Sequence, residues 1–180
     1  MKGRKLKFPA GKKTRPTSQK VRTAVFNIIG PKLEGAAALD LFAGTGAMGI
    51  EAISRGAASA VFVDSGREAA RIIKDNIEAL DLADRARLMA KKAGPAIKLL
   101  DAEGKRFDLV FIDPPYQGRE GDRVMKLLAS LNIIEPDALI IIEHPAGQGL
   151  AKSYGGLETF DNRRYGATGV SFYRTKEQEP

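Results

Sequence analysis

Hydrophobic and polar positions follow two different periods along this chain of 180 residues, and these periods predict its strands and helices. Short apolar runs predict strands that are buried on both faces. Apolar positions three or four residues apart on otherwise polar segments predict amphipathic helices. The predicted strands cover 36–41, 60–63, 86–90, 109–112 and 138–143, and the predicted helices cover 19–29, 47–55, 67–80, 95–100 and 123–131.

The last part of the chain has a different pattern. Residues 157–163 and 169–174 resemble two strands around Tyr165-Gly166, which predicts a hairpin. Alternating strand and helix units followed by a hairpin predict an α/β fold. We expect a Rossmann-like, mostly parallel sheet of seven strands with a C-terminal antiparallel hairpin and helices on both faces. A boundary near Gly30 would separate a basic N-terminal arm and helix (1–30) from the remaining domain (31–180).

The most distinctive stretch is Asp113-Pro114-Pro115-Tyr116, directly after a buried strand. Proline cannot continue a strand, so this stretch should leave the sheet as a stiff turn at the edge where open α/β sheets bind ligands. The Asp113 carboxylate and the Pro114 carbonyl can each accept a hydrogen bond from an exocyclic amino group, and the Tyr116 ring can stack on a base. The competing interpretation is ordinary turn chemistry with loop packing.

A second candidate stretch follows the first predicted strand, where glycines recur with G-x-G-x-x-G spacing before a helix. Such glycines permit a tight turn and a close approach to a ligand at the helix N-terminus. An acidic residue at the end of the next strand is placed to bind ribose hydroxyls. The candidate cofactor-binding residues are Asp40, Phe42, Ala43, Gly44, Thr45, Gly46, Gly49, Asp64 and Ser65.

Asp40 distinguishes between two cofactors that fit this spacing. A carboxylate there would repel the pyrophosphate of a nicotinamide dinucleotide, whereas it suits the positive charge of S-adenosylmethionine. Asp64 would then accept hydrogen bonds from the ribose hydroxyls. Simpler roles are also open, because Asp40 could fix the turn and Asp64 could be an ordinary residue at a strand end.

The net charge of +7 is concentrated at the N-terminus. Ten basic residues precede the first acidic one, Glu34, whereas the other 19 basic residues are outnumbered by 22 acidic ones. Such a block usually indicates contact with nucleic-acid phosphates, and a solvated tail is the alternative. The candidate RNA-binding residues are Lys5, Lys12, Lys13, Arg15, Thr17, Arg22 and Tyr165.

Composition narrows the remaining classes of function. The chain has no cysteine, which excludes disulfides, thiolate catalysis and cysteine-based metal sites. Its single histidine, His144, is a minor candidate for substrate contact, and we expect no metal site. Apolar runs are far shorter than the ~20 residues of a membrane span, and the basic N-terminus lacks the apolar core of a signal peptide. We therefore expect a cytoplasmic protein, a monomer, without membrane contact.

Taken together, these motifs resemble a family. Asp-Leu-Phe-Ala-Gly-Thr-Gly and Asp-Pro-Pro-Tyr resemble class I, amino-directed methyltransferases. A wider set is similar to the bacterial 16S ribosomal RNA guanine-N2 methyltransferases of the RsmD type, over nearly the whole chain. That set comprises Arg15-Pro-Thr, Arg22-x-x-x-Phe26-Asn27, Leu39 to Gly49, Glu51-Ala-x-Ser54-Arg55-Gly56-Ala57, Asp108 to Tyr116 and Tyr165-Gly-x-Thr168-x-x-Ser171-Phe172-Tyr173.

The resemblance implies methyl transfer from S-adenosylmethionine to a guanine of 16S rRNA, either free or in a small-subunit assembly intermediate. There are two departures. Asp64 stands where the family more often has Glu, and Lys92-Ala93 stands where it usually has Asp-Ala, so its adenine contact is not transferred to this chain. The alternatives are an N-methyltransferase acting on another RNA, DNA or protein amine, a catalytically silent RNA-binding assembly factor and, last, a nicotinamide oxidoreductase.

Overall fold

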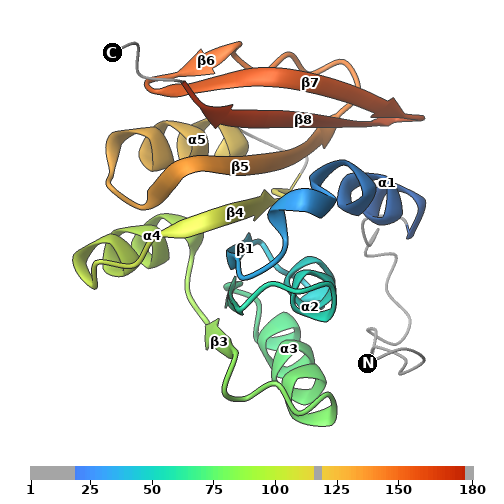
Figure 1. The fold of residues 1–180 in the computed structure, drawn as a ribbon, viewed down its shortest axis with the longest axis vertical. Coiled ribbons are helices and arrows are strands. Elements are labelled where there is room, and N and C mark those ends of the chain that lie inside the picture. The colour runs from blue at the N-terminus through green and yellow to red at the C-terminus, as the bar shows by residue number, and fades with distance from the viewer. Residues whose placement is uncertain (1–18, 116–118, 177–180) are drawn as a thin grey trace.

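The computed structural model describes residues 19–115 and 119–176, within which eight strands form one mixed sheet in the order β3-β2-β1-β4-β5-β8-β7-β6 (Figure 1). The first five strands pair in parallel, and the last three pair antiparallel. The strands are β1 (Ala37–Leu41), β2 (Ser59–Val63), β3 (Ala86–Met89), β4 (Phe107–Ile112), β5 (Ile134–Pro145), β6 (Ser153–Tyr154), β7 (Leu157–Tyr165) and β8 (Thr168–Thr175).

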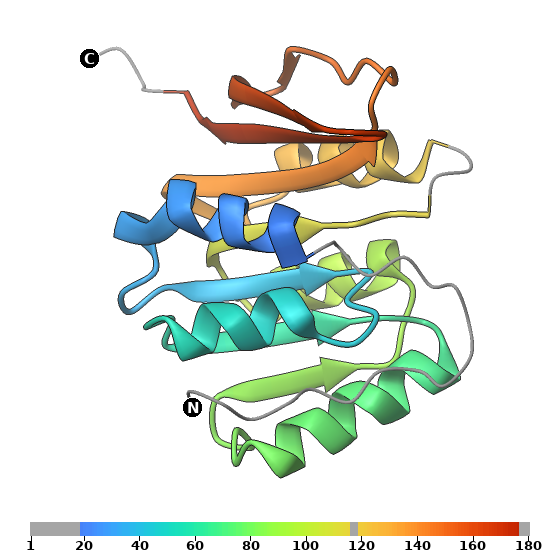
Figure 2. The ribbon, with the colours of Figure 1, turned by 90° about the vertical axis from the view of Figure 1, so that its right-hand side faces the viewer.

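Helices cover both faces of this sheet (Figure 2). One face is covered by α1 (Gln19–Ile29), α2 (Ala47–Ser54) and α3 (Arg67–Ala79), and the other by α4 (Ala93–Ala102) and α5 (Glu120–Ser130). A short 3-10 helix, η1 (Gly30–Lys32), joins α1 to the segment before β1. Because β1 to β5 run parallel to one another, their carboxyl ends lie along one edge of the sheet.

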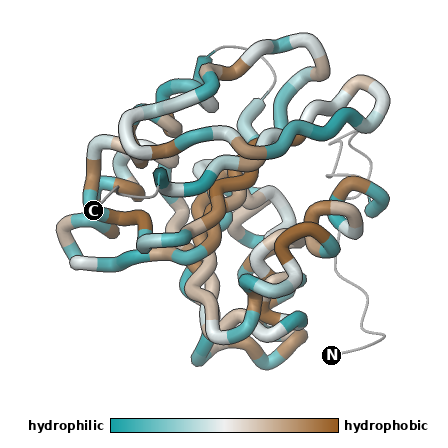
Figure 3. Tube along the Cα trace, turned by 45° about the horizontal axis from the view of Figure 1, so that its top comes forward, coloured by the Kyte–Doolittle hydropathy of each residue, from teal (hydrophilic) through white to brown (hydrophobic). Residues whose placement is uncertain are grey.

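Two buried clusters, one on each face, hold the layers together. The first joins α1 to the sheet, where the Phe26 ring lies 5.7 Å from that of Phe111 and under the Arg55 guanidinium. The second fills the space under α4 and α5 and includes Tyr173. In Figure 3 the hydrophobic positions gather along the central strands, as expected for parallel strands covered on both faces.

The predicted fold class is confirmed, and most element boundaries agree within one to three residues. The sheet has eight strands where seven were predicted, because the two-residue β6 pairs with the edge strand β7. So short a strand has no period of its own in the sequence. Strand β5 begins at Ile134, four residues earlier than predicted, and its pairing with β4 is irregular between Phe107 and Leu109.

Helix α1 shares the core of the sheet, so the described part of the expected N-terminal region is packed against the domain. Residues 1–18 lie outside the described residues, and the division at residue 30 stays a prediction. In the two described segments, 19–115 and 119–176, no helix is both long and apolar enough to cross a membrane.

Candidate active site

The glycine-rich turn lies between β1 and α2, and its backbone leaves the common conformations at three positions. Phe42, Gly44 and Gly46 all have positive φ, at 59°, 57° and 77°. Phe42 is the notable case, because residues other than glycine rarely adopt a positive φ except at constrained sites. The turn brings the Phe42 side chain to the carboxyl end of β1.

Asp64, at the end of β2, holds this turn in place. One carboxylate oxygen, Oδ2, accepts a hydrogen bond from the Gly44 amide at 2.9 Å, and Oδ1 accepts one from the Gly66 amide at 2.7 Å. On the other side of the turn, the buried Asn76 of α3 donates its Nδ2 hydrogen to the Thr45 carbonyl at 3.0 Å. Sequence analysis identified Asp64 but missed Asn76, which lies inside an amphipathic helix without a recognisable motif.

Gly49 is required by packing. A Cβ at this position would lie 2.4 Å from Cε1 of Phe62, a fully buried ring on β2. A Cβ on Gly46 would lie 3.2 Å from the same atom. The glycines therefore let the first turn of α2 rest directly on β2, which fixes the helix N-terminus beside the strand ends.

Asp40 is buried in β1, with 3% of its surface exposed, and its Oδ2 accepts a hydrogen bond from the Gly49 amide at 2.9 Å. Burial raises the pKa of this carboxyl to about 8, and the nearby carboxylates of Asp113 and Asp64 add to the shift, although the Gly49 hydrogen bond opposes it. The contact with Gly49 matches the turn-fixing role. A role in binding a cationic cofactor stays a prediction.

A pocket beside the turn, called the cofactor pocket below, has a volume of about 410 Å³. Three of the candidate cofactor residues, Phe42, Asp64 and Ser65, line it. Asp40 instead lines a different, small cavity. The cofactor pocket is not lined by Ala43, Gly44, Thr45, Gly46 or Gly49. Sequence analysis did not predict the part of this pocket's wall that is formed by residues before and within α4 and by α5. These residues are Lys91, Lys92, Ala93, Gly94, Pro95, Glu120, Arg123, Val124 and Leu127.

This lining fits a nucleoside. Phe42, Val63 and Leu127 supply apolar surface, and the half-buried Asp64 supplies a carboxylate at the strand end. The volume lies within the ~300–1,000 Å³ typical of small-molecule sites. Lys92 borders the pocket but has no carboxylate to accept a hydrogen bond from an adenine amino group.

Asp113 and Pro114 follow β4, the strand next to β1. The Asp113 amide approaches the Leu41 carbonyl at 3.4 Å, which ties the start of the stretch to the glycine-rich turn. Asp113 is half-buried, Pro114 is buried and Pro115 is exposed, while Tyr116 lies outside the described residues. A Cβ on Gly121 would lie 3.3 Å from Cγ of Pro114 and 3.0 Å from Cδ1 of Ile142, so this glycine lets α5 begin close to the proline.

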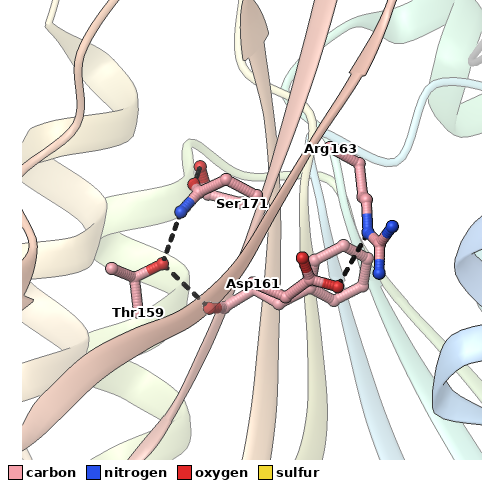
Figure 4. Close-up of polar contacts among 6 residues, drawn as sticks. Thr159, Asp161, Arg163 and Ser171 are labelled. Carbon is pink, nitrogen blue, oxygen red and sulfur yellow. Dashed lines mark hydrogen bonds and ion pairs between the residues drawn. The ribbon is translucent and has the colours of Figure 1, made fainter.

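His144, on β5, contacts the Pro145 carbonyl through Nδ1 and the hairpin through Nε2. Its Nε2 lies 2.9 Å from Oγ of Ser171, and Ser171 donates to Oδ1 of Asn162 at 2.6 Å. Asn162 in turn donates to Oγ1 of Thr159 at 3.2 Å. Figure 4 shows polar contacts of β7 and β8 around Thr159, Asp161, Arg163 and Ser171. Gly169 stands opposite His144, and a Cβ there would lie 2.4 Å from its ring.

The candidate RNA-binding residues are only partly described. Lys5, Lys12, Lys13, Arg15 and Thr17 lie outside the described residues. Arg22 is half-buried on α1, and Tyr165 is partly buried against the first core cluster at the end of β7, consistent with hairpin packing. Within 19–115 and 119–176, no group of three or more His, Asp or Glu side chains is arranged to hold a metal ion.

Comparisons with known proteins agree with this architecture. The model of a family described as "Conserved hypothetical protein 95" matches residues 1–174. YlbH of Bacillus subtilis, provisionally named an rRNA methyltransferase, is 37% identical over 97% of this chain and 95% of its own length. Ribosomal RNA small subunit methyltransferase D of Escherichia coli is 34% identical over 82% of this chain and 73% of its own length.

Solved structures extend the comparison. The structure of yhhF from Escherichia coli, provisionally titled a methyltransferase, superposes with a TM-score of 0.84 at 27% identity, covering 98% of this chain and 94% of that one. A more distant structure, SMU.776, is provisionally titled a methyltransferase complexed with SAH. It shares the fold alone, with 16% identity, a TM-score of 0.67 and coverage of 83% of this chain and 49% of that one. The predicted fold class and cofactor are thus those of this group of proteins.

Proposed function

Because the chain belongs to the family described as Conserved hypothetical protein 95, we propose that it transfers a methyl group from S-adenosylmethionine to the exocyclic N2 of a guanine in 16S rRNA. The relatives support the class of reaction and the class of substrate, since they are named as rRNA methyltransferases. The choice of a guanine amino group rests on the stretch after β4 and on the resemblance of the motifs.

One observation carries the proposal: two different ligand-binding elements lie at adjacent strand ends. The turn after β1 borders a pocket with apolar walls and the Asp64 carboxylate. The next strand, β4, ends in a carboxylate followed by two prolines, and its Asp113 amide reaches the Leu41 carbonyl at the start of the turn. A methyl donor in the pocket and an amine at Asp113 would therefore be neighbours.

The chemistry requires positioning more than acid–base catalysis. Bound S-adenosylmethionine would supply a methyl group already activated by its sulfonium. The Asp113 carboxylate and the Pro114 carbonyl would accept the two hydrogens of the guanine N2, so that its lone pair points away from both acceptors. Such orientation can contribute about 7–11 kcal/mol in ideal cases. Formation of the new N–C bond would break the methyl–sulfur bond of the donor, whose sulfur would leave with the electron pair, and the nitrogen would release one proton to Asp113 or to solvent.

The substrate must present an accessible base, because an amino group inside an RNA helix is out of reach. An unstacked or single-stranded guanine in naked rRNA or in a small-subunit assembly intermediate meets this requirement. The basic arm that precedes α1 would contact the phosphates around it. Its residues stay candidates on the basis of charge alone.

The decisive experiment uses radiolabelled S-adenosylmethionine with 16S rRNA, small subunits, DNA and protein from a strain that lacks the gene. We expect label in one RNA nucleotide, which nucleoside digestion identifies as N2-methylguanosine. Label in DNA or protein, or at another atom of the base, would contradict the proposal. RNA binding without any label would favour the silent assembly factor.

A further inference from the structure

Glu143 is a buried carboxylate that the proposed chemistry does not use. It is 9% exposed and lies near the carboxyl end of β5, the strand next to β4. The register pairs Ile112 with Ile142, so the next residue on each strand, Asp113 and Glu143, follows side by side. Neighbouring strands are ~4.8 Å apart, which brings Glu143 next to the residue that would hold the amine.

Both carboxylates belong to the face of the sheet that α1 covers. Phe111 and Ile141, two residues earlier on each strand, lie in the core cluster under α1, and side chains two residues apart point to the same face. Asp113 and Glu143 accordingly line one small cavity of about 20 Å³, whose apolar walls include Val25. This volume is too small for a base, so a base would lie across its rim and point one edge at the carboxylates.

We propose that Glu143 selects guanine by accepting a hydrogen bond from its N1–H, an inference that rests on the proposed function. In guanine, the ring N1–H donor is next to the N2 amino group. If Asp113 and the Pro114 carbonyl accept the two amino hydrogens, the neighbouring acceptor on β5 is placed for N1–H. In adenine, the atom beside the amino group is a ring acceptor, which would face the Glu143 carboxylate lone pair to lone pair.

In this arrangement Glu143 determines which base is accepted, in addition to contributing to the affinity for RNA. A site built to accept a hydrogen from the substrate rejects an analogue without that hydrogen, because a ring acceptor then faces the carboxylate lone pair to lone pair. A suitable analogue is 2-aminopurine, which keeps the amino group at position 2 but lacks both the hydrogen on N1 and the oxygen on C6, so comparison with Glu143→Gln separates the contribution of N1–H.

The experiment compares guanosine and 2-aminopurine placed in 16S rRNA at the nucleotide that the parent protein labels. We expect kcat/KM of the parent to favour guanosine by about 100-fold, the order expected for one hydrogen bond to a charged group. In Glu143→Gln this preference should fall about ten-fold, since the amide can turn its N–H toward N1 of 2-aminopurine. Affinity for S-adenosylmethionine should stay within about two-fold of the parent.

Glu135→Gln is the matched control, because Glu135 lies at the other end of β5 and pairs with Arg106 at 3.9 Å. It should leave the preference unchanged. An unchanged preference in Glu143→Gln, or equal losses with both bases, would overturn the inference while leaving the proposed function intact. If Glu143→Gln does not fold, the rates of the parent protein with the two bases test the inference. Equal rates with guanosine and 2-aminopurine would overturn it. A parent that methylates no guanine would overturn both proposals.

Discussion

The turns that follow β1 and β4 lie side by side but are built from opposite kinds of residue. After β1, glycines and one strained Phe42 curl the backbone, and its amides donate to side chains: Gly44 to Asp64 and Gly49 to Asp40. After β4, two prolines extend the backbone and have no amide hydrogen to donate. The turn after β1 is held by hydrogen bonds that its backbone amides donate to carboxylates. The turn after β4 is held by the stiffness of its proline rings and presents hydrogen-bond acceptors.

This difference would let one edge of the sheet serve the two ligands of the proposed reaction. The glycines let the first turn of α2 lie directly on β2, and the Gly44 amide donates to the Asp64 carboxylate beside the pocket. The proline turn cannot adjust, so the Asp113 carboxylate and the Pro114 carbonyl keep a fixed relation. A fixed pair of acceptors is what an amino group with two hydrogens requires. Four measurements test this comparison.

The largest effect is expected at the proline turn. Asp113→Ala should lower single-turnover methyl transfer about 100-fold, because an interaction made mainly in the transition state is lost. Affinity for S-adenosylmethionine, measured by calorimetry, should be nearly unchanged. Asp113→Asn should lose less, since its amide oxygen still accepts one hydrogen bond. A parental rate in Asp113→Ala would locate the reaction elsewhere.

At the glycine turn, Asp64→Ala should instead weaken binding of S-adenosylmethionine by about 1.5–3 kcal/mol, because the ribose hydroxyls lose a charged acceptor. The Gly44 and Gly66 amides would also lose their partner, so the fold should be checked by circular dichroism. Calorimetry measures the affinity. Parental affinity in a folded variant would rule out the ribose role.

Gly49→Ala tests the packing of the same turn. The added Cβ would meet the buried Phe62 ring, and overpacking of this kind costs about 1–3 kcal/mol. Thermal unfolding should show a lower Tm. Gly30→Ala is the matched control, because a Cβ there would have no atom within 4 Å, and its Tm should stay close to that of the parent. Equal Tm values for the two variants would contradict this account of Gly49.

The effect that builds up most gradually concerns Asp40. Its folded-state pKa is raised to about 8 from an ordinary value of 3.8, so the folded protein keeps a proton that the unfolded chain releases. Its contribution to stability is therefore complete below about pH 4 and is lost as the pH rises to about 8. The loss is at most about 1.4 kcal/mol per pH unit.

Urea unfolding of the parent and of Asp40→Asn from about pH 5 to 9 measures this contribution. The variant keeps an acceptor for the Gly49 amide but cannot titrate. The stability of the parent relative to the variant should fall with rising pH and level off above about 8. A difference that does not depend on pH would show that Asp40 is ionised throughout.

Much of this architecture can be predicted from local pattern. The apolar run that ends at Ile112 and the prolines after Asp113 predict a buried strand and its abrupt end, because burial and missing amides act on neighbouring residues. The spacing of Gly44, Gly46 and Gly49 predicts the turn for the same reason. Asp64 was identified because it stands at the end of the next apolar run.

What the sequence alone determined was therefore the order of elements, the fold class and the residues at the strand ends. Only the tertiary structure decided which of them share a cavity. It placed Asp40 in one cavity with Asp113 and Glu143, brought Lys92 and Arg123 to the cofactor pocket, and fixed the turn through Asn76. These partners lie far apart along the chain and are joined by strand register and helix packing, which leave no period or spacing in the sequence.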